Sequence, residues 1–497
     1  MRAEIAVNPP IQTPARVLAE RIRALAPALV VLLACALQSI AIYNARTDFF
    51  TDDTGFFFRY ARHIAMGEGY RWNLGEPPIW GASAPLWPAL LAACVAVGIS
   101  PESAAVGLGA ALTLIATGLL ADCLSRMASP LAGAAFAIFA ACNYRFSAWG
   151  IQGMETPLTY LVVALCICAI AYRWSWVAIG VLSALAAIHK LDLVPLAGLL
   201  VVSHGFQAGW RSGLRSAGEA AVIVGVAAVA AWIHFGSLLP NSAVTKMEYT
   251  FHMATDWFWT QGLYSGSRMI LLVLALLSIP WIVVRPALFG VCWCFVVVIL
   301  AAFSLKPPAE GYEWYLSSIQ PILLLLAAAG ATSLLGVASS PGRFRRPWAA
   351  TLGFVAGISG IGVIMIHQDA PALRFHKLGI QKMEGDRVAA GRWIAANTPK
   401  DAVVLTGFGN VAYYCDRYVI DYSFLNRTPP IEPPYDMVAR LKPDVVCFCN
   451  CGSPLPIDQY YPPPGYRIAA VFDSAARAGV AHFYAVVMLP NRETADR

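Results

Sequence analysis

Charged side chains are scarce in this sequence: Asp, Glu, Lys and Arg make up only 13% of its 497 residues. Soluble domains carry about 25% charged residues. Hydrophobic residues reach 58% and the mean hydropathy is +0.60. A water-soluble core cannot bury that much apolar surface, so a soluble multidomain enzyme is excluded. Gly and Pro show no period, which excludes a collagen-like chain. The composition is that of a membrane protein.

Several common functional signatures are also missing. The formal net charge is +6, but the basic residues are not clustered with aromatic ones, so no nucleic-acid partner is expected. The sequence has no Walker loop, no GxGxxG motif after a predicted strand and no internal repeat. The apolar run 24–45 lacks a clear small-residue cleavage site. We interpret it as an uncleaved first span behind an N-terminal tail, residues 1–23, that carries four arginines.

Apolar segments dominate the chain as far as residue 367. A spanning helix needs about 20 mostly apolar residues. Eleven segments are candidates: 24–45, 103–124, 130–148, 156–172, 175–190, 191–206, 216–236, 267–284, 286–304, 315–336 and 347–367. A further run, Ala84–Ser100, is ambiguous, because it can cross the membrane or lie at its surface.

The arginines beside the spans decide this ambiguity, because cytoplasmic loops carry an excess of Lys and Arg. If Ala84–Ser100 does not cross, all flanking arginines fall on the side of the N-terminus: Arg16, Arg21, Arg23, Arg126, Arg173, Arg211, Arg215, Arg285, Arg343, Arg345 and Arg346. We therefore expect a cytoplasmic N-terminus and a long first outer loop, residues 46–102, with juxtamembrane or re-entrant helices. The odd number of spans then places the C-terminal region outside.

From about Gln368 the composition becomes that of a soluble domain. Helical periodicity over Asp386–Asn397 ends before Pro399. Short strand-like runs follow at Val403–Thr406, Tyr418–Asp421, Asp444–Phe448, Arg467–Phe472 and His482–Met488. We expect a small extracytoplasmic α/β domain over residues 368–497, behind a transmembrane domain over residues 24–367.

Four cysteines in this C-terminal region have three open interpretations. Cys447, Cys449 and Cys451 alternate along a predicted strand, so they share one face of it. With Cys415 nearby, a disulfide can form in an outer compartment. A metal site is a weaker interpretation because paired C-x-x-C spacing is missing. Ordinary buried thiols are the third.

Two adjacent carboxylates, Asp52 and Asp53, follow directly after the first span. The next residues predict an interfacial helix with Phe56, Tyr60 and His63 on one face. Asp53 suits a helix N-cap, but capping explains one acid and not two. A carboxylate of ordinary pKa, about 3.9, is ionised at neutral pH and can accept a proton from an attacking hydroxyl. Its neighbour can orient the hydroxyl or hold a divalent cation.

The order and spacing of several motifs resemble those of a known family. These motifs are Asp52-Asp53, Phe58-Arg59-Tyr60-Ala61-Arg62, Gly67-Glu68-Gly69, Asn73-Leu74-Gly75-Glu76, Ser83-Ala84-Pro85-Leu86-Trp87, Gly153-Met154-Glu155-Thr156-Pro157-Leu158 and Leu239-Pro240-Asn241-Ser242. Together they resemble the GT-C superfamily of multi-span glycosyltransferases. The pattern is most similar to mycobacterial terminal arabinofuranosyltransferases. Lipid A aminoarabinose transferase and protein O-mannosyltransferases are more distantly similar.

The resemblance implies an inverting sugar transfer from a polyprenyl-phosphate donor to a glycan, glycolipid or protein acceptor at the outer face of a bacterial inner membrane. It implies that Asp52 or Asp53 is the base and that Glu155, in the second outer loop, assists. A helix N-terminal charge before Pro157 is the other interpretation of Glu155. No cofactor is certain, and the metal requirement stays open.

A departing phosphate needs cationic or N–H partners. The candidates for substrate binding are Arg59, Arg62, His63, Lys190, Lys246 and Tyr315. The stretch His189-Lys190-Leu191-Asp192 can instead hold a structural His–Asp or Lys–Asp pair, because ionisable groups between apolar runs are costly unless paired. Lys246 can instead be a snorkelling lysine.

One departure from the family pattern concerns Tyr315. Many relatives carry an Arg-Tyr pair there, whereas this chain has Glu313-Trp314-Tyr315. Either Lys306 or another base replaces the missing cation, or the donor head group is held differently. A degenerate, non-catalytic scaffold for envelope assembly is therefore the main alternative function. A transporter is a weaker one, since no matching halves with broken spans are visible.

Overall fold

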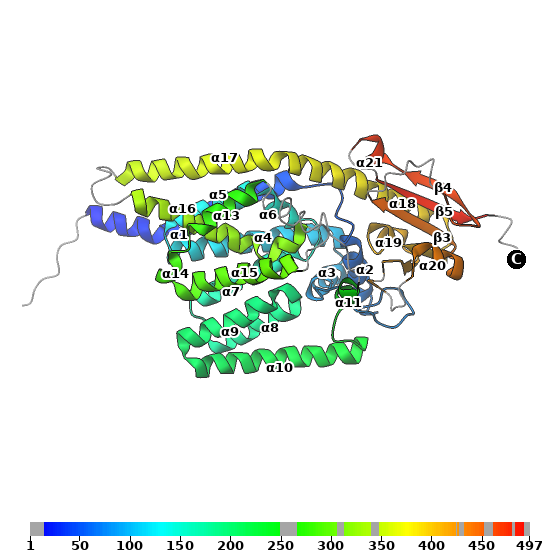
Figure 1. Cartoon of the computed structure of the whole chain (residues 1–497), viewed down its shortest axis with the longest axis horizontal. Helices are drawn as coiled ribbons and strands as arrows, with labels where there is room; N and C mark the ends of the chain where they lie inside the picture. The colour runs from blue at the N-terminus through cyan, green and yellow to red at the C-terminus, as the bar shows by residue number, and fades with distance from the viewer. Residues whose placement is uncertain are drawn as a thin grey trace, which may run out of the picture.

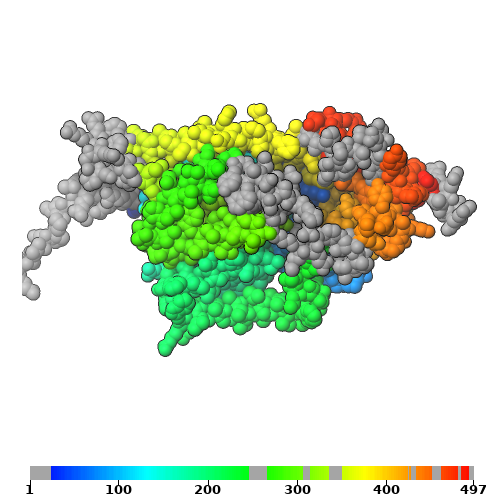
Figure 2. Space-filling view, viewed as in Figure 1, coloured from blue at the N-terminus to red at the C-terminus, as the bar shows by residue number. Residues whose placement is uncertain are grey.

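The computed structural model describes residues 14–248, 266–305, 313–338, 347–423, 425–426, 432–451, 461–479 and 483–491. A bundle of helices occupies most of the molecule, and a five-stranded sheet lies at one end of it (Figure 1). Helix α17 (Pro347–Gly379) forms one edge of the bundle and helices α8–α10 form the opposite edge (Figure 2).

Helices cover all eleven apolar segments. The helices of the bundle are α1 (Pro14–Ala45), α4 (Pro101–Met127), α5 (Pro130–Cys142), α6 (Tyr144–Trp149), α7 (Thr156–Ala171), α8 (Trp176–His189), α9 (Val194–Ala208), α10 (Trp210–Phe235), α13 (Ser267–Leu276), α14 (Trp281–Val284), α15 (Val291–Leu305), α16 (Gln320–Ala338) and α17. Within the described residues, six helices are long and apolar enough to cross a membrane. The chain is thus a multi-pass membrane protein, while the count of eleven spans stays a prediction.

Some predicted spans are broken by local chemistry. Segment 130–148 divides at Asn143, whose side-chain oxygen accepts a hydrogen bond from the backbone N–H of Phe146 and so caps α6. Helix α1 begins at Pro14, ten residues before the predicted span, so part of the expected tail is helical.

The first loop contains two helices, as predicted, but one lies in a different environment. Helix α3 (Leu86–Ala96) has 11 residues, too few to cross a bilayer. Helix α2 (Thr54–Ala65) was expected at a lipid interface. Instead it is covered by α3 and by α19 (Asn410–Cys415), and Phe57 and Phe58 are at most 1% exposed.

The C-terminal sheet has the order β2-β1-β3-β5-β4. Its strands are β1 (Val403–Thr406), β2 (Tyr418–Asp421), β3 (Val445–Cys451), β4 (Tyr466–Phe472) and β5 (Phe483–Pro490). β1 pairs with β2 and β3 in parallel, and β5 runs antiparallel to β3 and β4. Helix α18 (Gly385–Asn397) packs on one face and α20 (Pro434–Leu441) on the other. The short helix α21 (Ser474–Arg477) lies beside β5.

Helix α17 joins the bundle to this sheet domain without a break. It continues through residues 380–384 into α18, so that one helix runs over Ala350–Asn397. The predicted domain boundary between residues 367 and 368 falls inside it. Asp369, 1% exposed, fixes the helix to the bundle: it pairs with Arg145 at 3.1 Å and accepts from the backbone N–H of Ser267 at 2.9 Å.

The thiols of Cys415, Cys447 and Cys449 are free in the structure. Cys447 and Cys449 share the face of β3 that packs against α18, as the alternation predicts. Burial raises the pKa of the Cys415 thiol, so it behaves as a buried thiol. The side chain of Cys451 lies outside the described part of the chain.

Candidate functional site

A pocket of about 70 Å³ lies where the first loop meets the start of α7 and the end of α8. Its polar side chains come from six residues: Asp53, Ser83, Glu155, Lys190, Ser242 and Tyr315. Phe56, Phe57 and Trp314 contribute aromatic walls. Four of the predicted site residues, distant in sequence, are thus brought together.

A close contact between two turns places Asp53 and Glu155 at this pocket. The Thr54 hydroxyl donates to the carbonyl of Gln152 at 2.8 Å. Gly153 has φ +80°, and a Cβ there would lie 2.4 Å from the Thr54 side chain. Only glycine fits both the left-handed backbone and the tight approach. The glycine of the Gly-Met-Glu motif is therefore needed to hold the two acids on one wall.

Lys190 and Glu155 form a buried ion pair in the pocket. Lys190 Nζ lies 3.1 Å from Glu155 Oε1 and 3.9 Å from Asp192 Oδ2, and the Lys190 and Glu155 side chains are 13% and 5% exposed. Lys190 has an extended backbone conformation between α8 and the 3₁₀ turn Leu191–Leu193. Such desolvated charges are costly unless they are paired.

Some polar atoms at this pocket lack partners. Glu155 Oε2 and Ser242 Oγ are buried without a hydrogen bond to any described residue. Asp192 Oδ1, on the far side of Lys190, is also unsatisfied. Buried polar atoms are nearly always hydrogen-bonded in proteins, so these atoms indicate a place for a polar ligand or water.

Asp53 and Asp52 point in different directions. Asp53 occupies the N-cap position of α2 but makes no side-chain capping hydrogen bond, and it lines the pocket. Asp52 Oδ1 accepts from the backbone N–H of Asn410 at 2.7 Å, and its Oδ2 lies 3.4 Å from Arg387 Nε. Asp52 therefore caps α19 of the sheet domain, and Asp53 is the acid that faces the pocket.

The Arg59 guanidinium makes four hydrogen bonds to the first loop and the sheet domain. It donates to the carbonyls of Trp72, Ala412 and Arg417 at 2.7–2.9 Å and to Asn73 Oδ1 at 2.9 Å. These bonds tie the first loop to the sheet domain. Arg59 is not among the residues that line the pocket.

Arg62 and His63 also contact the first loop and the sheet domain. Arg62 pairs with Asp416 at 3.1 Å and lies over the Tyr413 ring. His63 Nδ1 lies 2.7 Å from the carbonyl of Arg71, so this nitrogen carries the proton and donates. Burial lowers the pKa of His63, which favours the neutral ring.

Tyr315 and Lys246 complete the predicted set. Tyr315 lies in the 3₁₀ segment Glu313–Ser318 and lines the pocket beside Trp314. Lys246 belongs to α11 (Asn241–Glu248), but its side chain lies outside the described part of the chain. Ser242, one turn earlier on α11, does reach the pocket.

Sequence reasoning missed several contributors. Ser83, Ser242 and Trp314 lie within or beside quoted motifs, but nothing in their local pattern marks them as pocket residues. Arg387 and Asn410 contact Asp52 from more than 330 positions away, and only the fold reveals this. Among the described residues, no group of three or more His, Cys, Asp or Glu side chains is arranged to hold a metal ion.

The helical bundle with a small sheet domain at one end has the fold of several proteins of known structure. ArnT from Cupriavidus metallidurans in the apo state aligns over 93% of this chain and 97% of its own, with a TM-score of 0.56 and 13% identity. The same protein bound to undecaprenyl phosphate gives a TM-score of 0.54 and 14% identity.

A third similar structure is the archaeal oligosaccharyltransferase AglB from Archaeoglobus fulgidus, in complex with an inhibitory peptide and a dolichol-phosphate. It aligns over 86% of this chain and 69% of its own, with a TM-score of 0.52 and 10% identity. No protein-family model and no curated protein matches the sequence. The likenesses establish the fold, while the finer similarity to arabinofuranosyltransferases stays a prediction.

Proposed function

We propose that this chain is a glycosyltransferase that moves a sugar from a polyprenyl-phosphate donor to a glycan, glycolipid or protein acceptor. The observation that carries the proposal is the pocket where Asp53, Glu155 and Lys190 meet at one end of an apolar bundle. The structures of ArnT with undecaprenyl phosphate and of AglB with a dolichol-phosphate and a peptide support these kinds of donor and acceptor. The pocket would face the periplasm from a bacterial inner membrane.

In the proposed reaction, Asp53 is the base. The acceptor hydroxyl oxygen bonds to the anomeric carbon while its proton passes to the Asp53 carboxylate. The bond from that carbon to the phosphate oxygen breaks, and polyprenyl phosphate leaves with the electron pair. Attack opposite the leaving group inverts the anomeric centre.

Lys190 would stabilise the charge that develops on the departing phosphate. It replaces the arginine that the Glu313-Trp314-Tyr315 stretch lacks, since its ammonium lies in the same pocket as Tyr315. Glu155 Oε1 holds Lys190 in place at 3.1 Å, and its second oxygen is free to accept from a sugar hydroxyl. Lys246 and Tyr315 remain further candidates for donor contacts, and a divalent cation remains open.

The neighbouring acids supply a matched experiment. Membranes containing the wild type, Asp53→Asn or Asp52→Asn are assayed with radiolabelled polyprenyl-phosphate sugars, arabinofuranose among them, with Mg²⁺ and with EDTA. We expect Asp53→Asn to lower transfer by about 100-fold or more, the usual loss for a general base. Asp52→Asn keeps most of the rate per folded molecule, because Asp52 contacts the sheet domain. Full activity in Asp53→Asn would reject this mechanism.

A further inference from the structure

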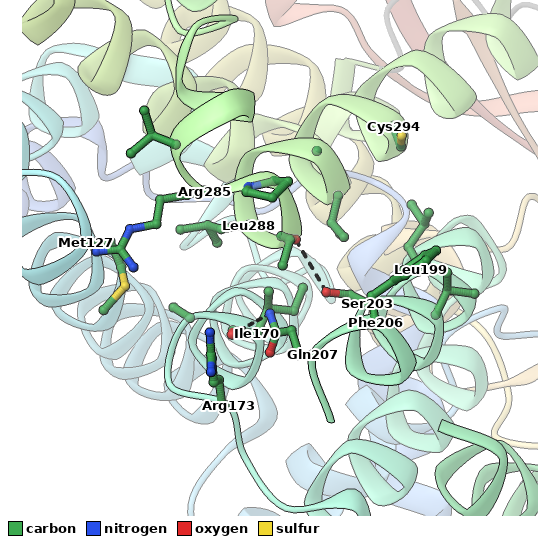
Figure 3. Close-up of a pocket in the computed structure, with 17 residues that line it drawn as sticks. Met127, Ile170, Arg173, Leu199, Ser203, Phe206, Gln207, Arg285, Leu288 and Cys294 are labelled. Atoms are coloured by element: carbon green, nitrogen blue, oxygen red, sulfur yellow. Dashed lines mark hydrogen bonds between the residues drawn. The ribbon is translucent and has the colours of Figure 1, made fainter. Parts of the chain in front are cut away.

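A second, larger cavity lies at the other end of the bundle from the candidate site. Its volume is about 680 Å³, within the range of small-molecule sites. Glu155 precedes α7 and Arg173 follows it, so the 16 residues of this helix, about 24 Å long, separate the two sites. The cavity walls are mostly apolar, and their only charged side chains within the described residues are Arg173 and Arg285 (Figure 3).

Arg173 occupies a backbone position that normally belongs to glycine. Its φ is +53°, and the N–H groups of Arg173 and Trp174 bond back to Ile170 and Ala169, which closes the C-terminus of α7. Glycine is the usual residue at this left-handed position, because a Cβ there carries a steric cost of about 1 kcal/mol. An arginine here therefore carries a small cost in folding stability, as do Asp416 and Lys442 at the ends of α19 and α20.

Arg285 is also placed by an unusual element. It precedes the π-helical turn Pro286–Gly290, and single π turns are frequent at functional sites. This turn supplies Pro286, Ala287, Leu288 and Gly290 to the cavity wall. Figure 3 shows Arg285 near Met127 on one side of the cavity, with Leu199 and Cys294 on the other.

The other polar side chains of the cavity bond to the protein, whereas the two arginines are exposed. Ser203 donates to the carbonyl of Ala287 at 3.4 Å and Gln207 to that of Ile170 at 3.3 Å. Neither Arg173 nor Arg285 has a side-chain hydrogen bond or an ion pair with any described residue. Both arginines are exposed, so their two positive charges lie at the surface beside an apolar cavity.

The rim of the cavity is exposed and apolar. The side chains of Phe206 and Val284 are 73% and 64% exposed, and both line the opening. In a membrane protein, such a rim faces lipid tails rather than water. Because Arg173 and Arg285 are exposed as well, an amphipathic ligand can lay its apolar part along this rim and its charged part against the arginines.

We propose that this cavity binds an anionic phospholipid, with its phosphodiester between Arg173 and Arg285 and one acyl chain along the apolar wall. Arginine guanidinium groups form strong charge-assisted hydrogen bonds with phosphate oxygens. The lipid would come from the inner leaflet, since the arginines that flank the spans gather at this end.

Native mass spectrometry of the detergent-purified full chain tests the proposal. The probes are phosphatidylglycerol, phosphatidylcholine and inorganic phosphate. We expect the wild type to retain phosphatidylglycerol and Arg285→Gln to bind it about tenfold more weakly. Arg173→Gly should show the same loss and keep its thermal stability, because glycine suits the left-handed position. Arg215→Gln, an exposed charge change outside the cavity, is the matched control and should bind like the wild type.

The other outcomes overturn the proposal. Equal retention of phosphatidylglycerol by the wild type and both cavity variants would show that the arginines do not hold it. Equal retention of phosphatidylcholine and phosphatidylglycerol by the wild type would remove the role of net lipid charge. Displacement of the lipid by millimolar inorganic phosphate would identify an anion site without an acyl-chain component. If either Arg173→Gly or Arg285→Gln fails to fold, lipid binding by the other variant tests the proposal.

Discussion

Arg387 Nε lies 3.4 Å from Asp52 Oδ2, although 335 positions separate the two residues in sequence. Glu384 accepts a hydrogen bond from Asn410 and pairs with the same arginine. These contacts fasten the sheet domain to the residue next to the proposed base. The sheet domain is therefore anchored to the first loop at the residue beside Asp53.

The first prediction concerns this fastening. Asp52→Asn and Arg387→Gln should each lower the free energy of unfolding by about 1–3 kcal/mol, because each leaves a partly buried polar partner. The double variant should cost less than the sum of the two single variants. Thermal unfolding of all four proteins in detergent measures the coupling. Strict additivity would show that the two side chains do not interact in solution.

The second prediction concerns Gly153. Gly153→Ala should destabilise the protein by about 1–3 kcal/mol, because its φ of +80° and the 2.4 Å approach to Thr54 exclude a Cβ. Sugar transfer should fall further than stability alone explains, since Glu155 moves with the turn. Gly107→Ala in α4, where nothing lies within 4 Å of an added Cβ, is the control and should be neutral or stabilising. Equal stability and equal sugar transfer of Gly153→Ala and Gly107→Ala would contradict a steric role of Gly153.

The third prediction concerns the buried pair Lys190 and Glu155. Removing one charge leaves the other buried alone, so Lys190→Met and Glu155→Gln should each cost about 3–5 kcal/mol of stability. The double variant should recover part of this loss but remain inactive. Melting temperatures and transfer rates of the three proteins check this. A double variant that is no more stable than the worse single variant would argue against a direct pair.

The fourth prediction concerns pH and Asp421. Burial raises the pKa of Asp421 to about 6, against the partly compensating N–H donors of Ser423 and Asn426. The native state thus keeps a proton that the unfolded chain releases near pH 3.9. Stability should therefore fall as the pH rises from about 4 to 6, by about 3 kcal/mol in total, and stay lowered above that range.

Asp421→Asn removes this titration. The melting temperature of the variant minus that of the wild type should increase between pH 4.5 and 6.5, because only the wild type loses stability there. Asp436→Asn, which removes an exposed carboxylate on α20, is measured beside it as the matched variant. A difference that stays constant with pH for Asp421→Asn would place the native pKa of Asp421 near the ordinary value.

Local sequence patterns predicted the helices and strands well, but they predicted contacts between distant residues poorly. The bounds of β1 and β2 match the sequence-based prediction, because alternation and the Pro399 break are encoded within a few residues. The pairing of Lys190 with Glu155 was not specified, since Asp192 was an equally good partner by sequence alone. The burial of α2 was missed because the helix that covers it, α19, is short and lies about 350 residues away. The orientation of the Asp52 side chain toward the sheet domain could not be predicted either, because its partners Arg387 and Asn410 are also distant in sequence.

The unbroken helix over Ala350–Asn397 has a mechanical consequence. Its 48 residues measure about 70 Å, more than twice the roughly 30 Å hydrocarbon thickness of a bilayer. A continuous helix of this length determines how far the sheet domain lies from the bilayer. It also transmits a tilt of the helical bundle to the sheet domain.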